Sequence, residues 1–277
     1  MYFDLHSHSH YSDGKLSPLE LAERMKAFGI DVFALTDHDT IAGVKEAQQT
    51  AQSIGIQCIS GVEISTRYEG MEIHIVGLNV DVDDTVFQKA LQTQLDKRWD
   101  RVEAMAKKLE YFEVEGVAEL LAGRENGQFA PGRPHFARLL IDAGLCKNME
   151  QAFKKFLGRN GRAFVGTHWV DVPTAVEWIR AAGGIPVLAH PNIYKLTRSK
   201  LIKLIQVFKE AGGQALEVQT ASTDANQIHK FATLAKQHEL WASQGADFHT
   251  PDYAWTKLGK LKALPDFVEP VWHHLPV

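Results

Sequence analysis

Val32-Phe33-Ala34-Leu35-Thr36-Asp37-His38-Asp39 joins four consecutive apolar residues to a segment of acidic and histidine side chains. A continuous apolar run of this length is typical of a strand that is buried on both faces, as in a parallel sheet covered by helices. Ile185 to Leu188 forms a second run of the same kind, and His190 follows it closely. The pattern predicts a parallel sheet with reactive side chains at the ends of its strands.

Helical segments alternate with such strands along most of the chain. Ser17 can cap a helix in which Pro18 takes the first position, Glu20 completes a capping box and Gly29 ends the helix. Further helices are expected over residues 41–53, 173–182, 199–211 and 225–238. Seven strands are expected, over residues 2–5, 32–35, 57–66, 72–78, 185–189, 215–218 and 240–243, with a hairpin signal at Glu69-Gly70. This alternation predicts an α/β fold, and a closed barrel is the favoured form.

The segment from about Asp81 to Arg162 interrupts this alternation. A long polar and basic helix pattern runs from Asp84 to Tyr111, and shorter helices follow near residues 117–122, 135–143 and 149–157. We interpret the segment as a helical insertion. Residues 1–80 and 163–277 would then form the barrel domain, and residues 81–162 an inserted domain that caps the substrate.

Composition excludes several classes of protein. The chain has 277 residues, 45% of them hydrophobic, which is enough for a large core in one domain or in one domain with an insertion. The formal net charge of -4 argues against a broad basic surface for long duplex nucleic acid. The two cysteines, Cys58 and Cys146, form no C-x-x-C pattern, so neither a disulfide framework nor a thiolate zinc site is expected. With no signal peptide or membrane span in the sequence, we expect a cytoplasmic protein.

Side chains that can bind metals fall at or near the ends of the expected strands. Each one alone has an ordinary alternative role, such as a buried interior histidine for His74 or a helix cap for Asp247. The carboxyl ends of parallel strands share one face of an α/β barrel, so the coincidence of these residues predicts a metal centre there. The candidate ligands are His6, His8, Asp13, His38, Glu63, His74, His190, Asp247 and His249.

Nine ligands are too many for one ion. Imidazoles and carboxylates without thiolates suit manganese, iron or zinc, and the ligand types alone do not separate these metals. A carboxylate such as Glu63 can bridge two ions, and a hydroxide shared by the ions would attack the phosphorus of a phosphoester. The cluster would stabilise the charge on the nonbridging oxygens. No general acid is assigned, because a ligating imidazole is a poor proton donor.

Several short motifs contain these residues and together carry a family resemblance. They are His6-Ser7-His8 with Asp13, Thr36-Asp37-His38-Asp39, Gly61-Val62-Glu63, His74, Ala189-His190-Pro191 and Gly245-Ala246-Asp247-Phe248-His249. This set resembles the PHP (polymerase and histidinol phosphatase) family of phosphoesterases. Within the family, residues 72–79, 133–138 and 240–245 are similar to the nucleoside 3',5'-bisphosphate phosphatases related to ribonuclease AM, with Pro134 departing from the expected small residue. The resemblance implies a distorted seven-stranded (β/α)7 TIM-like barrel and three divalent ions, usually Mn2+.

Basic residues of the insertion offer a second contact for a substrate. Arg98 and Arg101 lie three positions apart on one expected helix face, while Arg133, His135 and Arg138 form a second group. A solvated helix face with local ion pairs is the alternative for the first pair. With the resemblance added, we expect Arg98, Arg101, Arg133 and His135 to hold a phosphate that does not react.

Such a clamp would select a nucleoside 3',5'-bisphosphate, for example adenosine 3',5'-bisphosphate. Hydrolysis of its 3'-phosphate would give the 5'-monophosphate and inorganic phosphate. The 5' end of a short 5'-phosphorylated RNA presents the same pattern, so 5'-to-3' exoribonuclease action is also expected. Other functions remain open at this point: a histidinol-phosphate-type phosphatase, an amidohydrolase-type zinc hydrolase, and a catalytically silent metal-binding or polymerase-accessory module.

Overall fold

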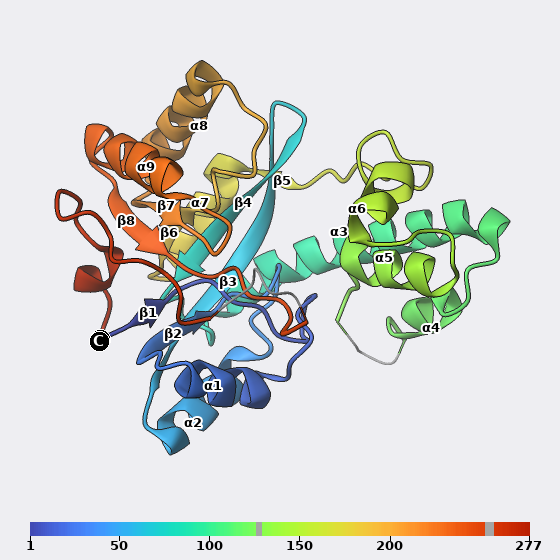
Figure 1. The fold of residues 1–277 in the computed structure, drawn as a ribbon, viewed down its shortest axis with the longest axis horizontal. Helices are drawn as coiled ribbons and strands as arrows, with labels where there is room; N and C mark the ends of the chain where they lie inside the picture. The colour runs from blue at the N-terminus through green and yellow to red at the C-terminus, as the bar shows by residue number, and fades with distance from the viewer. Residues whose placement is uncertain (126–128, 253–257) are drawn as a thin grey trace.

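A computed structural model describes residues 1–125, 129–252 and 258–277, and its centre is a sheet curled into a nearly closed barrel (Figure 1). The strands follow one another in the order β1-β2-β3-β4-β6-β7-β8. The chain after β1 closes the ring, because Leu5 N donates to Gln244 O at 3.0 Å and Asp247 N donates to His6 O at 2.9 Å. The strands are β1 (Phe3–Asp4), β2 (Val32–Leu35), β3 (Gln57–Tyr68), β4 (Met71–Leu78), β6 (Ile185–Leu188), β7 (Ala215–Gln219) and β8 (Trp241–Gln244). The prediction of a distorted seven-stranded α/β barrel is confirmed.

The expectation of a parallel sheet is wrong for one strand. β4 runs antiparallel to both of its neighbours, β3 and β6. The cause is the two-residue turn Glu69-Gly70, in which both residues have positive φ (45° and 78°), because such a turn can join only antiparallel strands. A further strand, β5 (Val170–Asp171), pairs with the end of β3 and was not predicted. Two residues are too few to produce a periodic signal.

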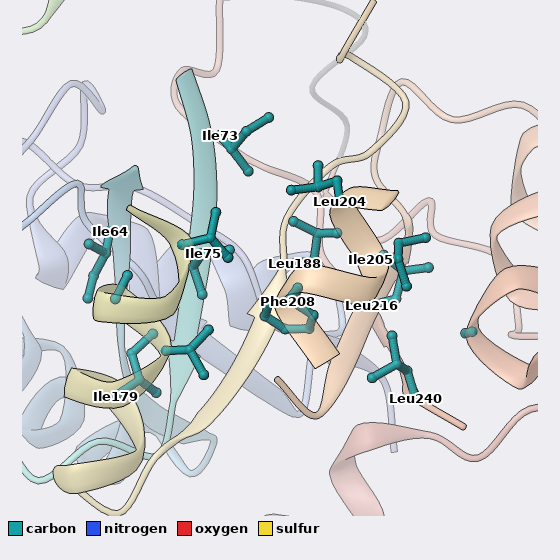
Figure 2. Packing of buried hydrophobic residues seen from close by; sticks show 14 of the residues in the cluster. Ile64, Ile73, Ile75, Ile179, Leu188, Leu204, Ile205, Phe208, Leu216 and Leu240 are labelled. Carbon is teal, nitrogen blue, oxygen red and sulfur yellow. The ribbon is translucent and has the colours of Figure 1, made fainter. Parts of the chain in front are cut away.

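Helices cover the outside of the barrel. Ser17 caps the first of them and forms the predicted capping box with Glu20, while Gly55 ends the second in a left-handed conformation. Figure 2 shows Phe208 of α8 beside Leu188 of the sheet, and Ile179 of α7 below Ile64 and Ile75 of the sheet, with all five side chains fully buried. Each such side chain contributes about 1.5–3 kcal/mol of burial free energy. The helices are α1 (Pro18–Ala27), α2 (Val44–Ile54), α7 (Val172–Ala181), α8 (Arg198–Glu210) and α9 (Ala225–Gln237).

The remaining helices lie together on one side of the barrel (Figure 1). They have a hydrophobic cluster of their own that includes Trp99, Phe136 and Phe156. The first part of α3 instead packs on the barrel through Phe87 and Leu91, so this long helix contacts both parts. The elements are α3 (Thr85–Leu109), η1 (Glu110–Phe112), α4 (Val117–Ala122), α5 (Arg133–Asp142), α6 (Met149–Ala152) and η2 (Phe153–Leu157), and a last turn, η3 (Val271–His274), lies near the C-terminus.

Long apolar helices are absent from the described part of the chain. Across residues 1–125, 129–252 and 258–277, none of the helices combines the length and hydropathy needed to cross a bilayer.

Candidate active site

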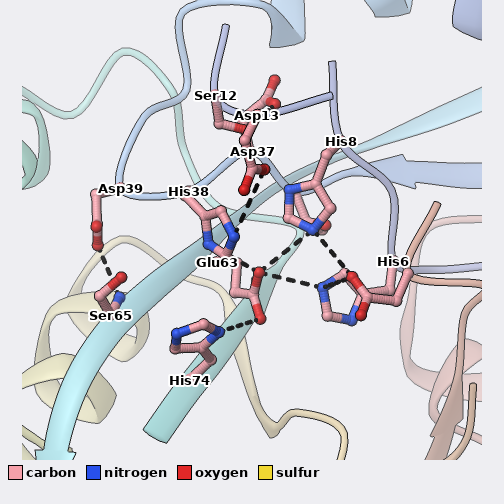
Figure 3. A network of polar contacts seen from close by, with 12 residues as sticks. His6, His8, Ser12, Asp13, Asp37, His38, Asp39, Glu63, Ser65 and His74 are labelled. Carbon is pink, nitrogen blue, oxygen red and sulfur yellow. Dashed lines mark hydrogen bonds and ion pairs between the residues drawn. The ribbon is translucent and has the colours of Figure 1, made fainter. Parts of the chain in front are cut away.

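All nine predicted ligand side chains lie together where the barrel strands end. Glu63 comes from the middle of β3, and Figure 3 shows its carboxylate at the centre, with histidine side chains on several sides. The other eight come from β4 and from the segments that follow β1, β2, β6 and β8. They are His6, His8, Asp13, His38, His74, His190, Asp247 and His249.

The fully buried Glu63 carboxylate makes the largest number of these contacts. Its Oε1 lies 2.9 Å from Nδ1 of His74 and 2.8 Å from Nε2 of His190. Its Oε2 lies 3.0–3.3 Å from ring nitrogens of three more histidines, His38, His6 and His8. One side chain thus joins donors from five histidines into a single cluster.

Two aspartates complete the cluster. Asp247 Oδ1 lies 3.3 Å from Nε2 of His8 and 3.5 Å from Nδ1 of His249. Asp13 Oδ1 lies 3.2 Å from Nε2 of His249 and 3.7 Å from Nε2 of His38. Burial alone would raise the pKa of Asp13, but His249, His38 and His8 hold it well below its usual range. Asp13 is therefore a carboxylate over the whole neutral pH range.

The cluster suits divalent cations. Ligand atoms about 2.1 Å from one ion lie roughly 3.0–3.4 Å from one another, which matches most of the separations above. Seven atoms of these side chains are buried without a hydrogen-bond partner within the described ranges: His6 Nε2, His8 Nδ1 and Nε2, Asp13 Oδ1, His38 Nδ1, Glu63 Oε2 and His190 Nδ1. Buried polar atoms of this kind are rare unless an unseen ion or water satisfies them. Four sets of side chains have ligand atoms within 4.8 Å of one another: His8, Asp13, His38 and His249; His6, Glu63 and His190; His6, His8 and Asp247; and His38, Glu63 and His74.

The histidines of the cluster differ in their protonation. Burial and the neighbouring His249 lower the pKa of His8 to about 3, so His8 is neutral and keeps a nitrogen lone pair available. Burial would also lower the pKa of His74, but Glu63 and Glu72 raise it to about 10. Protonated imidazoles such as that of His74 therefore compensate part of the negative charge of the buried carboxylates in the free protein.

The backbone at the strand exits is strained. Asp39, His190 and Asp247 have φ values of 55°, 28° and 54°, in the left-handed region that few non-glycine residues adopt. Gly245 lies against His6, and a Cβ on this glycine would be 2.3 Å from the Cβ of His6. The chain turns sharply at these positions and brings His190 and Asp247 over the end of the barrel, while Asp39 faces Arg98.

Glu217 supports the cluster and was missed in the sequence. It lies in β7, is buried, and places Oε1 3.0 Å from Nδ1 of His6, while its Oε2 accepts a hydrogen bond from His190 N at 2.6 Å. This contact directs Nε2 of His6 toward the cluster. The available signal was an acidic residue in an otherwise apolar strand, Ala215-Leu216-Glu217-Val218.

Asp37 holds the loop that carries Asp13. Its carboxylate accepts hydrogen bonds from Ser9 N at 2.8 Å, from Ser9 Oγ at 2.6 Å and from Ser12 Oγ at 2.6 Å. These bonds fix the loop after β1 beside the loop after β2, so Asp37 acts on the cluster through the backbone.

Arginines of the insertion meet next to His74. Glu72 lies 3.1 Å from Nη2 of Arg133, 3.6 Å from Nη2 of Arg101 and 3.4 Å from Nε2 of His74. Burial would raise the pKa of Glu72, but His74, Arg133 and Arg101 hold it well below its usual range. The Arg101 guanidinium also lies 5.7 Å from the ring centre of Trp169. A basic and aromatic surface therefore adjoins the ligand cluster.

The other predicted substrate-binding residues have different surroundings. Arg98 donates from Nε to Asp39 Oδ2 at 2.6 Å and from Nη2 to Ser65 Oγ at 2.8 Å, so two of its three nitrogens are used inside the protein. His135 lies in the first turn of α5, where its Nδ1 accepts a hydrogen bond from Gly132 N at 3.1 Å. Arg138, although close to Arg133 in sequence, lines a separate cavity.

Comparison with known proteins places the chain in a family. Residues 4–221 match the model of the PHP domain. A 5'-3' exoribonuclease of Haemophilus influenzae is 44% identical over 98% of this chain and 97% of its own length. A 3',5'-nucleoside bisphosphate phosphatase of Chromobacterium violaceum is 38% identical over 98% of this chain and 95% of its own length. A structure from the same organism, described as an amidohydrolase with bound sulfate and no metal, has a TM-score of 0.90 at 36% identity and covers 99% of this chain and 95% of that one. The chain therefore belongs to the PHP domain family, as a phosphoric ester hydrolase of the subgroup that contains the nucleoside bisphosphate phosphatases and 5'-3' exoribonucleases.

Proposed function

We propose that this enzyme hydrolyses the 3'-phosphate of nucleoside 3',5'-bisphosphates, such as adenosine 3',5'-bisphosphate, to the 5'-monophosphate and phosphate. The same site would remove nucleotides from the 5' end of short 5'-phosphorylated RNA. The observation that carries the proposal is the contact between two groups: Glu72 joins the ligand His74 on one side to Arg101 and Arg133 on the other. The names of the two relatives, a phosphatase and an exoribonuclease, support both activities.

The nine clustered side chains would hold three divalent ions, with Mn2+ preferred and Zn2+ or Fe2+ as alternatives. Glu63 would be the shared ligand, because its two oxygens face different histidines. Ions at this cluster supply Lewis acidity toward the phosphoryl oxygens and lower the pKa of a bound water. Glu217 would fix the ring of His6, and Asp37 would fix the position of Asp13.

The arginines would bind the phosphate that does not react. A terminal phosphate dianion matches the planar fork of a guanidinium better than a single carboxylate oxygen does. In the free protein Glu72 occupies Arg101 and Arg133, and a 5'-phosphate would take up donors that Glu72 leaves unused. Arg98, held by Asp39, would add positive charge beside Arg101, and His135 would offer its second ring nitrogen. Binding energy from this remote phosphate would place the 3'-ester at the cluster.

The helical insertion, residues 81–162, would cap the site. It carries Arg98, Arg101, Arg133 and His135, whereas the barrel carries every proposed metal ligand. This division assigns substrate choice to the insertion and bond cleavage to the barrel.

The test is phosphate release by chelator-treated protein reloaded with Mn2+. We expect adenosine 3',5'-bisphosphate to give equimolar phosphate and 5'-monophosphate, and adenosine 3'-monophosphate, which lacks the second phosphate, to be a much poorer substrate. Mn2+ should also raise the unfolding temperature of the wild type but not that of Glu63→Gln. Hydrolysis of the monophosphate without release from the bisphosphate would contradict the substrate assignment, and an unfolding temperature indifferent to Mn2+ would contradict the metal assignment.

A further inference from the structure

A cavity of about 680 Å³ lies between the insertion and the barrel, directly beside the ligand cluster. Three cluster residues, Asp13, Asp247 and His249, form part of its wall. The facing wall comes from α5 and the start of α6, and the loop after β7 closes a third side. A volume of this size is typical of sites for small molecules. It is separate from the cavity that Glu72 and Arg133 line.

Two charged residues line the facing wall, Arg138 on α5 and the exposed Glu150 at the start of α6. Arg138 is the one that can bind an anion. It is half-buried, and the described ranges provide it with neither a hydrogen bond nor an ion pair. Arg98, Arg101 and Arg133, in contrast, each face a carboxylate. The charge of Arg138 contributes to the lowered pKa of Asp252, whose carboxylate accepts hydrogen bonds from Lys15 and Thr250. A partly desolvated guanidinium that forms no direct ion pair with a carboxylate is well suited to an anion from outside the protein.

An RNA substrate continues beyond the reacting phosphate, so the site must also leave room for the second nucleotide. In the bisphosphate, the reacting phosphorus carries three nonbridging oxygens. In RNA, one of these positions carries the 5'-oxygen of the second nucleotide. Hydrolysis adds the oxygen of water to phosphorus and breaks the bond to the 3'-oxygen, which receives a proton from that water. The phosphate stays on the second nucleotide as a new 5'-phosphate, so the shortened RNA is again a substrate.

The two arginines of α5 face different directions. Arg133 and Arg138 are five residues apart, which corresponds to about 140° around a helix. Arg133 faces Glu72, where the proposed function places the 5'-phosphate of the first nucleotide, while Arg138 faces the cavity beside Asp247 and His249. The cavity therefore lies where the chain beyond the reacting phosphate can leave the cluster.

We propose that this cavity binds the second nucleotide of a 5'-phosphorylated RNA and that Arg138 binds the backbone phosphate on its 3' side. Ile141 and Met149 provide an apolar wall for the base, and Thr220 and Ser222 provide hydroxyls for the sugar and phosphate. This inference rests on the proposed function, since it takes the reaction and the place of the first nucleotide from it. It adds Arg138 as a residue that would contact an RNA substrate but not the free bisphosphate.

The test compares two substrates in the wild type and in three variants. Wild type, Arg138→Ala and the control Arg180→Ala are assayed on adenosine 3',5'-bisphosphate and on a 5'-phosphorylated trinucleotide RNA. Arg180 is an exposed residue at the end of α7, before β6, and so at the opposite end of the barrel from the cluster. We expect Arg138→Ala to lower the ratio of kcat/KM for RNA to kcat/KM for the bisphosphate at least tenfold, with Arg138→Lys recovering part of it. Arg180→Ala should change this ratio less than twofold.

The salt dependence of KM for RNA is a second measurement, and it should not change if Arg138 has only a structural role. Removing one phosphate contact to a single strand should reduce the slope of log KM for RNA against log salt concentration by about 0.7. Equal losses on both substrates, or an unchanged slope and ratio, would overturn the inference. A wild type that cleaves the bisphosphate but does not shorten the RNA would overturn it as well. A wild type inactive on both substrates would instead overturn the proposed function.

Discussion

Replacing Glu217 by glutamine should weaken binding of divalent cations about 10- to 100-fold while the barrel stays folded. Glu217 serves two donors, with Oε1 3.0 Å from His6 Nδ1 and Oε2 2.6 Å from His190 N. Glutamine keeps one acceptor oxygen and replaces the other by an NH2 donor. At one of these two contacts, two donors would then face each other and the hydrogen bond would be lost. A charge-assisted hydrogen bond lost at a buried site corresponds to about 1.5–3 kcal/mol. An affinity loss of 10- to 100-fold corresponds to about 1.4–2.7 kcal/mol, which agrees with that value.

The assay is calorimetric titration of chelator-treated protein with Mn2+, with Glu177→Gln as the control because Glu177 is exposed on α7. Thermal unfolding of the metal-free variants is measured in parallel. If Glu217→Gln bound Mn2+ within twofold of the wild type, the reasoning that Glu217 orients His6 would be refuted. If its only effect were a lower unfolding temperature without metal, Glu217 would serve the fold and not the cluster.

Three further predictions concern the clamp, the turn at the cluster and a buried thiol. Arg133→Ala should lower kcat/KM for adenosine 3',5'-bisphosphate at least tenfold while largely sparing an aryl phosphate; equal losses on both would remove the clamp. Gly245→Ala should reduce the free energy of unfolding in urea by about 1–3 kcal/mol, because its Cβ would lie 2.3 Å from that of His6, whereas Gly166→Ala meets no close atom and is the control. Burial raises the pKa of Cys58 to about 12, above the value of about 8.5 in an unfolded chain. The folded protein then keeps a proton that the unfolded chain releases, so its stability should fall as pH rises from about 8.5 toward 12. Cys58→Ala should reduce that slope by up to about 1.4 kcal/mol per pH unit, and an identical slope in both proteins would contradict the raised pKa.

Features set by neighbouring residues could be read from the sequence. The capping box of Ser17 and Glu20 and the helix end at Gly29, which has a left-handed φ of 75°, depend only on a few adjacent residues, and both are present. The gathering of the nine candidate ligand side chains was also predictable, because the ends of barrel strands meet at one face whatever the details of the loops.

Features set by distant partners could not be read in this way. The pairing of Arg98 with Asp39 joins residues 59 positions apart, and no local pattern reveals it. Glu217 has no local pattern that reveals its contact with His6, 211 positions away. The direction of β4 is a different case. The turn Glu69-Gly70 already indicated an antiparallel pair, but the prediction of a parallel sheet followed the alternation of strands and helices in the rest of the chain.

The left-handed backbone at Asp39 and Asp247 affects how a mutational scan of this enzyme should be designed. An alanine at either position would remove the carboxylate and also place a poorly suited residue at a φ near 55°, at a cost of roughly 1–2 kcal/mol. Asparagine tolerates this conformation and has nearly the same shape as aspartate, so it removes the charge alone. The difference between the alanine and asparagine variants then measures the conformational part. Without that pair, a scan would attribute to ligand chemistry a loss that belongs to the main chain.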